Sequence, residues 1–581
     1  MWLKDVEDTQ GELSLGKHGD NAARPRDLLF HKTIRLAVSA DVRLSNLETD
    51  IIDTADFQRL RRVQQLGASS WVYPTAVHTR FDHSIGVLKV VDEMITSIRD
   101  ALIHVSPKST SNADNTKTFD VTDEQRILAR LYALLHDITH VPFGHTLEDE
   151  LGIFDSHDAF QKEEGATDGI ERFEKLLGRE SEIASLIISQ IGASMYERFR
   201  EIYIKGKYAR LHAKDSQGDV FDEFIYYLVS DTVCADLMDY LARDSYFCSL
   251  ELRVPRRFLH YLYISDVDVP GLKGKRRRIV VKLWKPRDGA PRTDVMTDLA
   301  GILDSRYMLA ERVYFHHAKV TVGAMIGRAV LEARDVGHLS SIDMLNFGDE
   351  TLIEFLDNLG YDETHSGERE KIASKLAKAV RNRKIYSRVE SYGRTSFSGQ
   401  GNEDPYDHLI RTFNDPALRK QHEDEIALIA GAEMGDVLVY VAPEKMNMKI
   451  SKAIVDFENK RCLLKDAKLE FLNDRLKTIE DSHRNLWRTY LLASRSLDKS
   501  KRELARLVFE AKFLPRAGSA DRWTLLLHNI TTNSNSFNNI SKEDLMKAIS
   551  RAASDLANNR NKIAHDRNSL EALNDAVRQY L

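Results

Sequence analysis

The run LARLYALLHDITHVPFGH, which ends at His145, constrains the fold and the chemistry of this chain more than any other segment. Its apolar residues recur at the three- and four-residue steps of a helix, which Pro142 must end or kink. Within ten residues the run carries His136, Asp137, His140 and His145. Imidazole and carboxylate together form a mixed nitrogen/oxygen donor set, which suits Mn, Fe, Zn or Mg better than a thiolate site does.

Two other polar clusters lie upstream and downstream of this run. The segment VHTRFDHS groups His78, Arg80, Asp82 and His83. The segment DTVCADLMDYLARD has helical spacing, and its polar residues are Asp236, Asp239, Tyr240, Arg243 and Asp244. The chain therefore carries three candidate clusters of polar residues, one on each side of the first run.

The composition is that of a globular protein, with 42% hydrophobic and 30% charged residues, and a length of 581 residues predicts two or three domains. The net charge of −6 argues against a generally basic nucleic-acid binder. Three cysteines without CxxC spacing indicate a reducing compartment. We find no signal peptide and no apolar segment near the ~20 residues that span a bilayer, so we expect a cytoplasmic protein without membrane contact.

The hydrophobic pattern predicts a mainly α-helical fold in four parts. Residues 1–48 form an N-terminal lead-in, and residues 49–340 form a helical core with one β-hairpin, FLHYLYISDVD and RRRIVVKLWKP. Residues 341–467 carry the strand-like segments DVLVYVAP and KAIVDFENKRCLL, and predict a small α+β appendage. The segment SYGRTSFSGQGNEDPYD predicts a loop. Residues 468–581 predict a helical C-terminal region.

In chain order the clusters read H-x-R-F-[DE]-H-S, H-D-[IL]-x-H-x-P-F-x-H and D-x-x-D-Y-x-x-R-D. These motifs resemble the HD-domain deoxynucleoside triphosphate triphosphohydrolases, well over residues 53–319 and more thinly to residue 466. The resemblance implies an HD-domain helical core and hydrolysis of a dNTP to deoxynucleoside and inorganic triphosphate. It also implies one divalent metal ion (Mn, Fe, Mg or Zn), held by His83, His136, Asp137 and Asp236.

Cleavage of the 5′ C–O–P linkage requires a proton for the departing oxygen, and histidine donates one well near neutral pH. We expect His145 to be this general acid, because Glu148, three residues on, would lie beside it on a helix and orient the ring. The family has a histidine with an acidic residue at this offset. His140 and His157 match family histidines that line the phosphates.

The resemblance also implies contacts with the sugar. Gln65 and Asp244 match residues that hold the 3′-OH, and Leu66 matches one that packs on the deoxyribose. Tyr240 matches a residue that abuts C2′, where it would exclude a ribose hydroxyl. These four residues would make the site selective for deoxyribonucleotides.

Arg80 and Arg306 match phosphate-binding arginines, and Tyr314 matches a tyrosine on the base side. Two positions depart from the vertebrate pattern. Leu237 stands where that pattern has a phosphate-contacting lysine, so one cationic contact with the triphosphate is missing or is supplied by another residue. Phe315 stands where it has glutamine, which leaves the base preference open.

Family members form oligomers and respond to nucleotides at allosteric sites, so we expect a homo-oligomer (dimer, tetramer or hexamer) and a nucleotide effector. The basic run KGKRRRIVVKLWKPR offers a site for an effector, single-stranded nucleic acid or another subunit, but a solvated hairpin tip is the simpler interpretation. Near the C-terminus, Arg560 and His565 have the R-x4-H spacing of HEPN ribonuclease domains; the simpler interpretation is a helical regulatory tail.

Two alternatives stay open. HD folds also serve phosphodiesterases and alarmone hydrolases, so the substrate could be a signalling nucleotide. No GYP tripeptide follows the His-Asp pair, however, and the H-x-P-F-x-H extension favours the triphosphohydrolases. In the second alternative the core senses a nucleotide and controls a C-terminal effector. A dNTP triphosphohydrolase would control or deplete dNTP pools, by analogy in antiviral defence.

Overall fold

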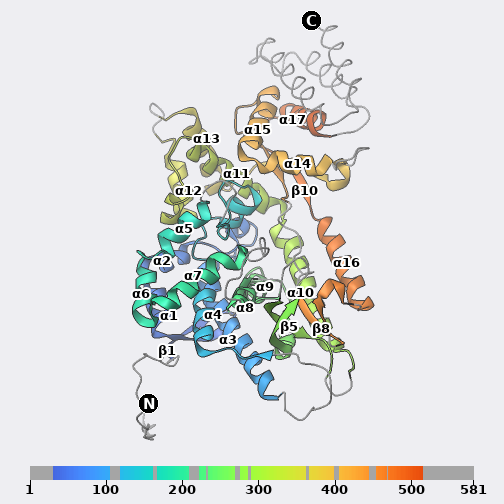
Figure 1. Ribbon diagram of the computed structural model, residues 1–581. Helices are drawn as coiled ribbons and strands as arrows, with labels where there is room; N and C mark the ends of the chain where they lie inside the picture. The colour runs from blue at the N-terminus through green and yellow to red at the C-terminus, as the bar shows by residue number, and fades with distance from the viewer. Residues whose placement is uncertain are drawn as a thin grey trace, which may run out of the picture.

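The computed structural model describes residues 30–104, 118–160, 167–208, 222–230, 233–268, 275–285, 289–361, 366–397, 405–443, 453–458, 460–467 and 469–514. Helices dominate this part of the chain, and its strands form small sheets (Figure 1). The mainly α-helical fold class is thereby confirmed. No helix among the described residues is both long and apolar enough to cross a membrane.

The N-terminal half begins with an antiparallel hairpin, β1 (Phe30–Leu36) and β2 (Ala40–Ser45). Ser45 then caps α1 (Asn46–Asp53) in a capping box with Glu48. Short turns follow: α2 (Ala55–Gln58), η1 (Arg59–Arg62) and η2 (Gly67–Trp71). The longer helices of this half are α3 (Arg80–His104), α4 (Asp123–Leu135), α5 (Asp168–Leu177), α6 (Glu182–Ile191), α7 (Ala193–Tyr208), α8 (Glu223–Ser230) and α9 (Ala235–Phe247).

Helix α4 brings the His-Asp pair to the centre of this half. Thr122 caps its start in a capping box with Gln125, and its apolar residues are buried in the first core. The helix ends at Leu135, so His136 is its C-cap. Pro142 therefore lies in the loop beyond the helix, and the helix end that we predicted at Pro142 comes seven residues earlier.

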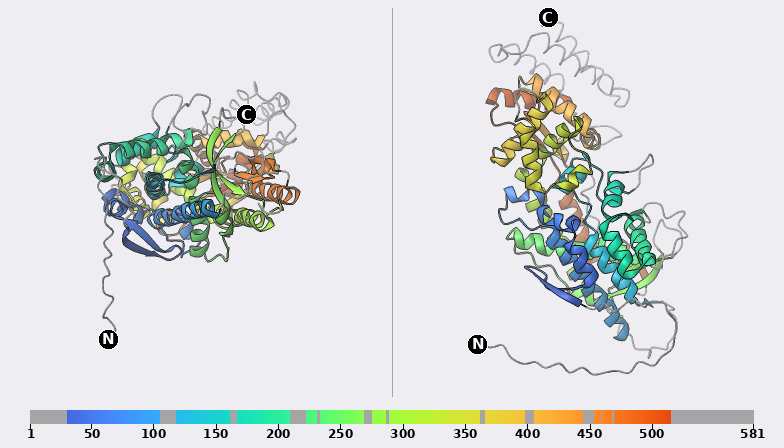
Figure 2. Two further views of the ribbon diagram at one scale, coloured as in Figure 1. Left: turned by 60° about the horizontal axis from the view of Figure 1, so that its bottom comes forward. Right: turned by 90° about the vertical axis from the view of Figure 1, so that its left-hand side faces the viewer.

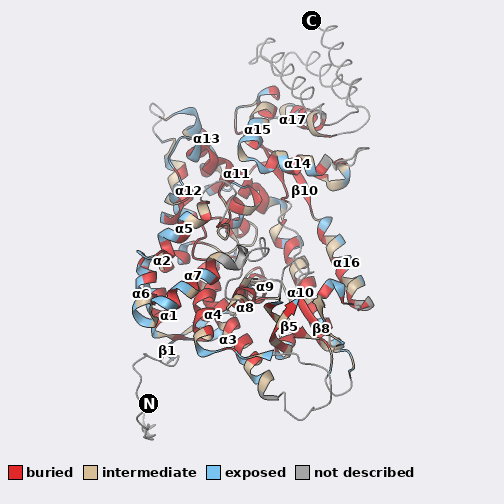
Figure 3. Ribbon diagram, viewed as in Figure 1, coloured by how far each residue is buried: buried red, intermediate tan, exposed pale blue. Residues whose placement is uncertain are grey.

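A second core surrounds α11 (His317–Asp335), which is buried along most of its length (Figure 3). In the side view of Figure 2 this part of the molecule lies above the N-terminal half. Its other helices are α12 (Asp349–Asn358), α13 (Glu368–Arg381), α14 (Pro405–Asn414), α15 (Pro416–Ile429) and α17 (Lys499–Phe513). The helices α10 (Thr293–Leu309) and α16 (Glu470–Arg484) pack together on the first core. The remaining turns are η3 (Thr146–Glu150), η4 (Arg257–Tyr261), η5 (Ala310–Tyr314), η6 (Asp343–Asn346), η7 (Arg394–Phe397) and η10 (Leu464–Asp466).

A five-stranded sheet joins segments from both halves of the chain. Its order is β3 (Thr118–Phe119), β4 (Leu262–Asp268), β5 (Lys275–Lys282), β8 (Ile454–Phe457) and β9 (Lys460–Leu463). Strands β4 and β5 form the predicted hairpin, in register from Leu262 opposite Val281 to Asp268 opposite Lys275. Strand β8 then adds to β5 in parallel.

The basic run of β5 is bound internally. Arg278 pairs with Glu223 over 2.8 Å and stacks on the Tyr227 ring, while Arg276 is 5% exposed. Arg277 pairs with Asp266 over 3.1 Å. These three arginines therefore do not form a free binding patch, whereas the tip of the hairpin, with Lys273, lies outside the described residues.

The second sheet corrects the predicted organisation of the C-terminal half. Its order is β6 (Ser387–Gly393), β10 (Arg488–Ala493) and β7 (Val437–Val441). We predicted residues 468–581 as helical, but β10 lies between α16 and α17 and is the central strand. The predicted appendage at residues 341–467 also divides, because β7 joins this sheet whereas β8 and β9 join the other. Strand β6 overlaps the start of the segment that we predicted as a loop. Arg560 and His565 lie outside the described residues.

Candidate functional site

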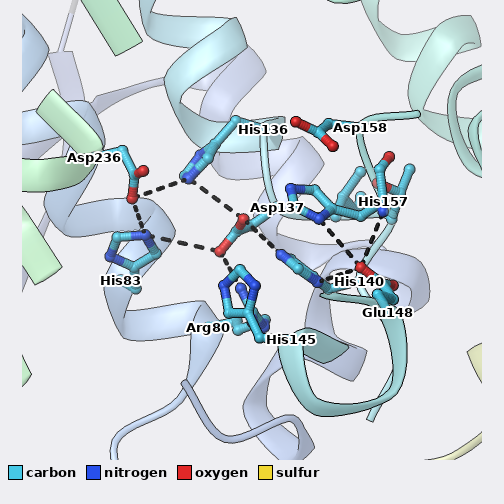
Figure 4. Close-up of polar contacts among 12 residues, drawn as sticks. Arg80, His83, His136, Asp137, His140, His145, Glu148, His157, Asp158 and Asp236 are labelled. Atoms are coloured by element: carbon cyan, nitrogen blue, oxygen red, sulfur yellow. Dashed lines mark hydrogen bonds and ion pairs between the residues drawn. The ribbon is translucent and has the colours of Figure 1, made fainter. Parts of the chain in front are cut away.

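Four predicted metal ligands converge from three helices (Figure 4). His83 lies on α3, His136 and Asp137 follow α4, and Asp236 lies on the first turn of α9. Nε2 of His83 is 3.0 Å from Asp236 Oδ1 and 3.7 Å from Asp137 Oδ2. Nε2 of His136 is 3.5 Å from Asp137 Oδ1 and 3.9 Å from Asp236 Oδ1. Ligand atoms of His83, His136 and Asp137 therefore lie within 4.8 Å of one another around a single point, and Asp236 lies beside both imidazole nitrogens.

Hydrogen bonds to the far nitrogens fix how both rings face that point. Nδ1 of His136 donates to the Ala133 carbonyl over 2.7 Å, and Nδ1 of His83 lies 2.9 Å from Asp239 Oδ2. The Nε2 atoms of both rings are buried and make no well-aligned hydrogen bond with any residue that the structure describes. Bare Nε2 atoms beside carboxylates are the arrangement that a bound divalent cation requires, so these residues fit a metal ion.

The charges of the cluster also favour a bound cation. Burial alone would lower the pKa of His83, but the neighbouring carboxylates of Asp236, Asp239 and Asp137 raise it to about 10. Burial opposes ionisation of Asp137, yet the neighbouring positive charges, with Arg80 foremost, hold its pKa well below the usual value. The carboxylates therefore stay ionised, and the cluster attracts positive charge.

Arg80 does not extend freely into solvent. Its side chain is buried, and Nη1 donates to Asp137 Oδ2 over 2.6 Å. We predicted a phosphate-binding arginine; here one N–H group of the guanidinium is engaged with a candidate metal ligand. Arg80 still lines the cavity described below.

Three histidines form a second group beside the metal ligands. The rings of His140 and His157 have centroids 3.6 Å apart, and the His145 ring lies 4.9 Å from that of His140. Burial, followed by the charges of Arg80 and His157, lowers the pKa of His140 to about 4. Burial opposes protonation of His157 as well, but Asp158 and Glu148 raise its pKa. His140 is therefore neutral near pH 7, whereas His157 holds its proton more firmly.

The acidic partner of His145 is Asp149 rather than Glu148, which corrects our prediction. Nδ1 of His145 lies 2.8 Å from Asp149 Oδ2. Residues Thr146–Glu150 form a π-helical turn. In this turn the side chain of Asp149, the fourth residue after His145, lies beside the His145 ring. Glu148 points into the protein, where it accepts from the backbone N–H of His157 and lies 3.2 Å from Nδ1 of that ring.

A cavity of about 950 Å³ adjoins both groups. All of the predicted sugar-, phosphate- and base-facing residues line it: Gln65, Leu66, Arg80, Tyr240, Asp244, Arg306 and Tyr314. The lining also includes His136, Asp137, His140, His145, His157 and Asp236. His83 and Glu148 stand behind this surface. Leu237 and Phe315, at the two positions that depart from the vertebrate pattern, also belong to the cavity lining.

One wall of the cavity is held by a hydrogen-bonded chain. Tyr314 donates its hydroxyl to Asp244 Oδ2 over 2.7 Å, and Nε2 of His78 lies 2.9 Å from Asp244 Oδ1. The His78 ring stacks on Phe247, with centroids 4.6 Å apart. Two partners therefore fix Asp244: His78, just before α3, and Tyr314, at the end of η5. Its carboxylate is oriented by the protein itself.

Several residues that shape the site were not predicted from the sequence. Asp239, which orients His83, could have been found as the second aspartate of D-x-x-D-Y. Arg59 donates to the carbonyls of Ile138 and His140 over 2.6 and 2.9 Å, and so holds the loop after α4. His483 reaches the cavity from α16. Burial lowers its pKa to about 4, and no local signal pointed to it.

A buried ion pair also belongs to the cavity lining. Lys319, on α11, donates to Glu150 at the end of the turn that follows His145. Both side chains are largely buried. Lys319 thus places a positive charge in the wall of a cavity in which the family lysine is replaced by Leu237.

Comparison with known proteins agrees with this geometry. Residues 80–243 match the family model of the HD domain, and residues 300–513 match that of the HD-associated region. An uncharacterized protein of Methanocaldococcus jannaschii is 28% identical over 327 residues, 56% of this chain and 55% of that protein.

Two relatives carry functional names. The deoxynucleoside triphosphate triphosphohydrolase SAMHD1 homolog of Dictyostelium discoideum is 26% identical over 375 residues, 62% of this chain and 60% of the relative. Human deoxynucleoside triphosphate triphosphohydrolase SAMHD1 is 24% identical over 317 residues, 52% of this chain and 45% of the relative. The matches thus span 45% to 60% of the length of these three relatives. The chain therefore contains an HD domain followed by an HD-associated region, and it is similar over part of its length to deoxynucleoside triphosphate triphosphohydrolases.

Proposed function

We propose that this protein hydrolyses a deoxynucleoside triphosphate to deoxynucleoside and inorganic triphosphate. One observation carries the proposal: the His/Asp cluster and all seven predicted substrate residues meet at one cavity of about 950 Å³. That volume lies in the range of small-molecule and cofactor sites. The names of the SAMHD1 relatives support the same substrate class.

His83, His136, Asp137 and Asp236 would hold one divalent ion, of Mn, Fe, Mg or Zn. Such an ion supplies a Lewis acid for the phosphate and a lowered pKa for the attacking water. Arg80 would keep Asp137 ionised and oriented through its 2.6 Å hydrogen bond. Arg59 would hold the backbone just after Asp137, because it binds the carbonyls of Ile138 and His140.

His145 would donate the proton to the departing 5′ oxygen. Its ring is exposed to the cavity, and the hydrogen bond with Asp149 orients it. His157, whose pKa Asp158 and Glu148 raise, would contribute a positive charge toward the phosphates when it is protonated, and neutral His140 would pack between these two rings. The proposal thus separates proton donation from anion binding.

Tyr240 and Asp244 would select the sugar. Asp244 is held by His78 and Tyr314, so its carboxylate has a defined position for the 3′-OH. Tyr240 would occupy the space beside C2′ and exclude a ribose hydroxyl. Gln65 and Leu66 would complete the sugar contacts from the opposite segment of the lining.

The experiment is an assay of the purified protein with each dNTP and NTP, with Mn or Mg, and chromatographic separation of the products. An Asp137→Ala variant serves as the control. Deoxynucleoside and intact triphosphate, both lost in the variant, would establish the reaction. Mixtures of nucleotides test the expected effector, and a size measurement with and without them tests the expected homo-oligomer. No turnover under any mixture would refute the proposal.

A further inference from the structure

Asp349, the first residue of α12, bridges two backbone segments of the cavity. Its Oδ2 accepts from the N–H of Gln64 over 2.8 Å, and its Oδ1 accepts from the N–H of Phe143 over 2.9 Å. The carboxylate is buried, with 2% of the residue exposed. Both oxygens thus bind segments that are far from α12 in the chain.

Each bridged segment carries residues that reach the cavity. Gln64 is followed by Gln65 and Leu66, and Phe143 is followed by Gly144 and His145; all of them line the cavity. The two segments approach it from different sides of the fold, one after η1 and the other after α4. The carboxyl group of Asp349 therefore spans the distance between them.

The second segment needs such support because its backbone is strained. Phe143 has a φ of 53°, in the left-handed region that bulky residues rarely adopt. Its ring is buried near Gly67 and Trp71, and its N–H is the group that Asp349 binds. A backbone held in a sparsely populated conformation persists only where its surroundings determine it, and such positions cluster at functional sites.

A close contact places α12 against the first segment independently of this carboxylate. A Cβ added to Gly348 would lie 2.5 Å from both the Cβ and the carbonyl oxygen of Arg62. Only glycine permits that approach, so the start of α12 rests directly on the residues before Gln64. The contact provides a second way to move Asp349 without altering its charge.

We propose that Asp349 is a positioning residue that sets the spacing between the Gln64–Leu66 segment and the Phe143–His145 turn. What the two segments do, sugar contact and proton donation, rests on the proposed function; the bridge itself does not. Asp349 lies in the part of the chain that matches the HD-associated region, whereas Phe143 lies in the HD domain. The associated region would then align the reacting groups of the HD domain.

The test compares Asp349→Asn with Gly348→Ala in the full chain. An asparagine oxygen accepts from one N–H, but its NH2 group cannot accept from the other. Asp298→Asn is the matched control, because Asp298 accepts from the Phe258 N–H over 3.1 Å at a place outside the cavity lining. Hydrogen exchange followed by mass spectrometry reports on peptides that contain Gln64, Phe143 and Phe258.

We expect exchange at Gln64 or Phe143 to be about 10-fold faster in both test variants, as for the loss of one buried hydrogen bond of ~1.4 kcal/mol. In Asp298→Asn only the Phe258 peptide should change. Per folded, metal-loaded site, kcat should fall at least about 10-fold in the test variants, and the ratio of kcat/KM for dNTP over NTP should change. A purely structural role would lower only the folded fraction.

Unchanged exchange at both peptides would overturn the proposal. Faster exchange with wild-type kcat, KM and sugar discrimination per folded site would also overturn it, because the spacing would then not matter. If the wild-type protein hydrolyses no nucleotide, the proposed function fails, and the exchange rates alone decide whether Asp349 positions the two segments. If Asp349→Asn does not fold, Gly348→Ala provides the same measurements.

Discussion

The carboxylate of Asp239 accepts a hydrogen bond from Nδ1 of His83 over 2.9 Å, and so turns Nε2 of that ring toward Asp137 and Asp236. Arg243 binds the same carboxylate through Nε and Nη2 over 2.8 and 2.9 Å. A side chain at Gly86 would overlap Asp239, so that glycine lets α9 approach α3 closely enough for the bond. The ligand nitrogen is thus aimed by residues that never touch the candidate metal position.

Replacing Asp239 by asparagine should weaken metal binding without removing a ligand. The amide would hold the His83 ring less firmly, and loss of such an orienting carboxylate typically costs about 10- to 100-fold in metal affinity. Metal content after dialysis against graded chelator measures the effect per folded protein. Asp298→Asn, remote from the cluster, should keep wild-type affinity. Equal affinities in the two variants would show that Asp239 does not orient the ligand.

Replacing Tyr240 by alanine should relax the choice of sugar. The space beside C2′ would then admit a hydroxyl, and discrimination against NTPs should fall by about 10- to 100-fold. The measurement is kcat/KM for matched dNTP and NTP pairs. Tyr246, on the same helix but 61% exposed, supplies the control variant Tyr246→Ala, which should retain discrimination. A signalling phosphodiesterase would show no change in either variant.

A double-mutant cycle should identify Asp149 as the partner of His145. His145→Ala removes the proposed proton donor and should lower kcat by about 10²- to 10⁴-fold. Asp149→Asn as a single change should lower kcat by less than His145→Ala does. In the His145→Ala background the same change should lower kcat no further. In a His157→Ala background the Asp149→Asn change should keep its full effect. Additive losses at residues 145 and 149 would reject the pairing.

The stability of the protein should depend on pH through Asp349. Burial raises the pKa of this carboxyl to about 7; the N–H groups of Gln64 and Phe143 and the charge of Arg80 oppose the shift, and Glu350 adds to it. An unfolded aspartate titrates near ~3.9. Between these values the folded state binds more protons than the unfolded state. This residue therefore stabilises the fold most below about pH 4, and that contribution is lost as the pH rises to about 7.

Urea unfolding of wild type and Asp349→Asn from pH 4.5 to 8 checks this sign. Wild type loses stability as the pH rises, whereas the variant does not. The free energy of unfolding of the variant minus that of wild type should therefore increase with pH, by at most ~1.4 kcal/mol per pH unit. The relative values should level off above about pH 7. A difference that is flat across the range would mean that Asp349 does not titrate in this window.

Three sequence motifs predicted the helical fold class and named the residues of the candidate site. His83, His136, Asp137 and Asp236 were each named by a motif, and the structure brings them together around one point. The pairing of Asp149 with His145 was missed because residues three and four positions on both lie beside a helical side chain, so the residue pattern alone does not choose between Glu148 and Asp149.

Other features depended on contacts between distant parts of the chain. Strand β10 reads as a short apolar run, which periodicity alone cannot distinguish from a buried helix, and only its pairing with β6 and β7 decides its conformation. His483 reaches the cavity, and Asp349 binds the backbone of two lining segments, from helices without a local motif. The bridge from Asp349 to Gln64 and Phe143 crosses hundreds of residues and is visible only in the folded chain.

The place of β10 has a consequence for how the polypeptide is made. Strands β6 and β7 do not pair with each other; each pairs with one side of β10, which follows both in the chain. A ribosome therefore releases two strands with open edges well before the strand that closes them. Open edges invite pairing with other chains. The nascent chain therefore exposes these unpaired edges to other chains as long as Arg488–Ala493 is still inside the exit tunnel.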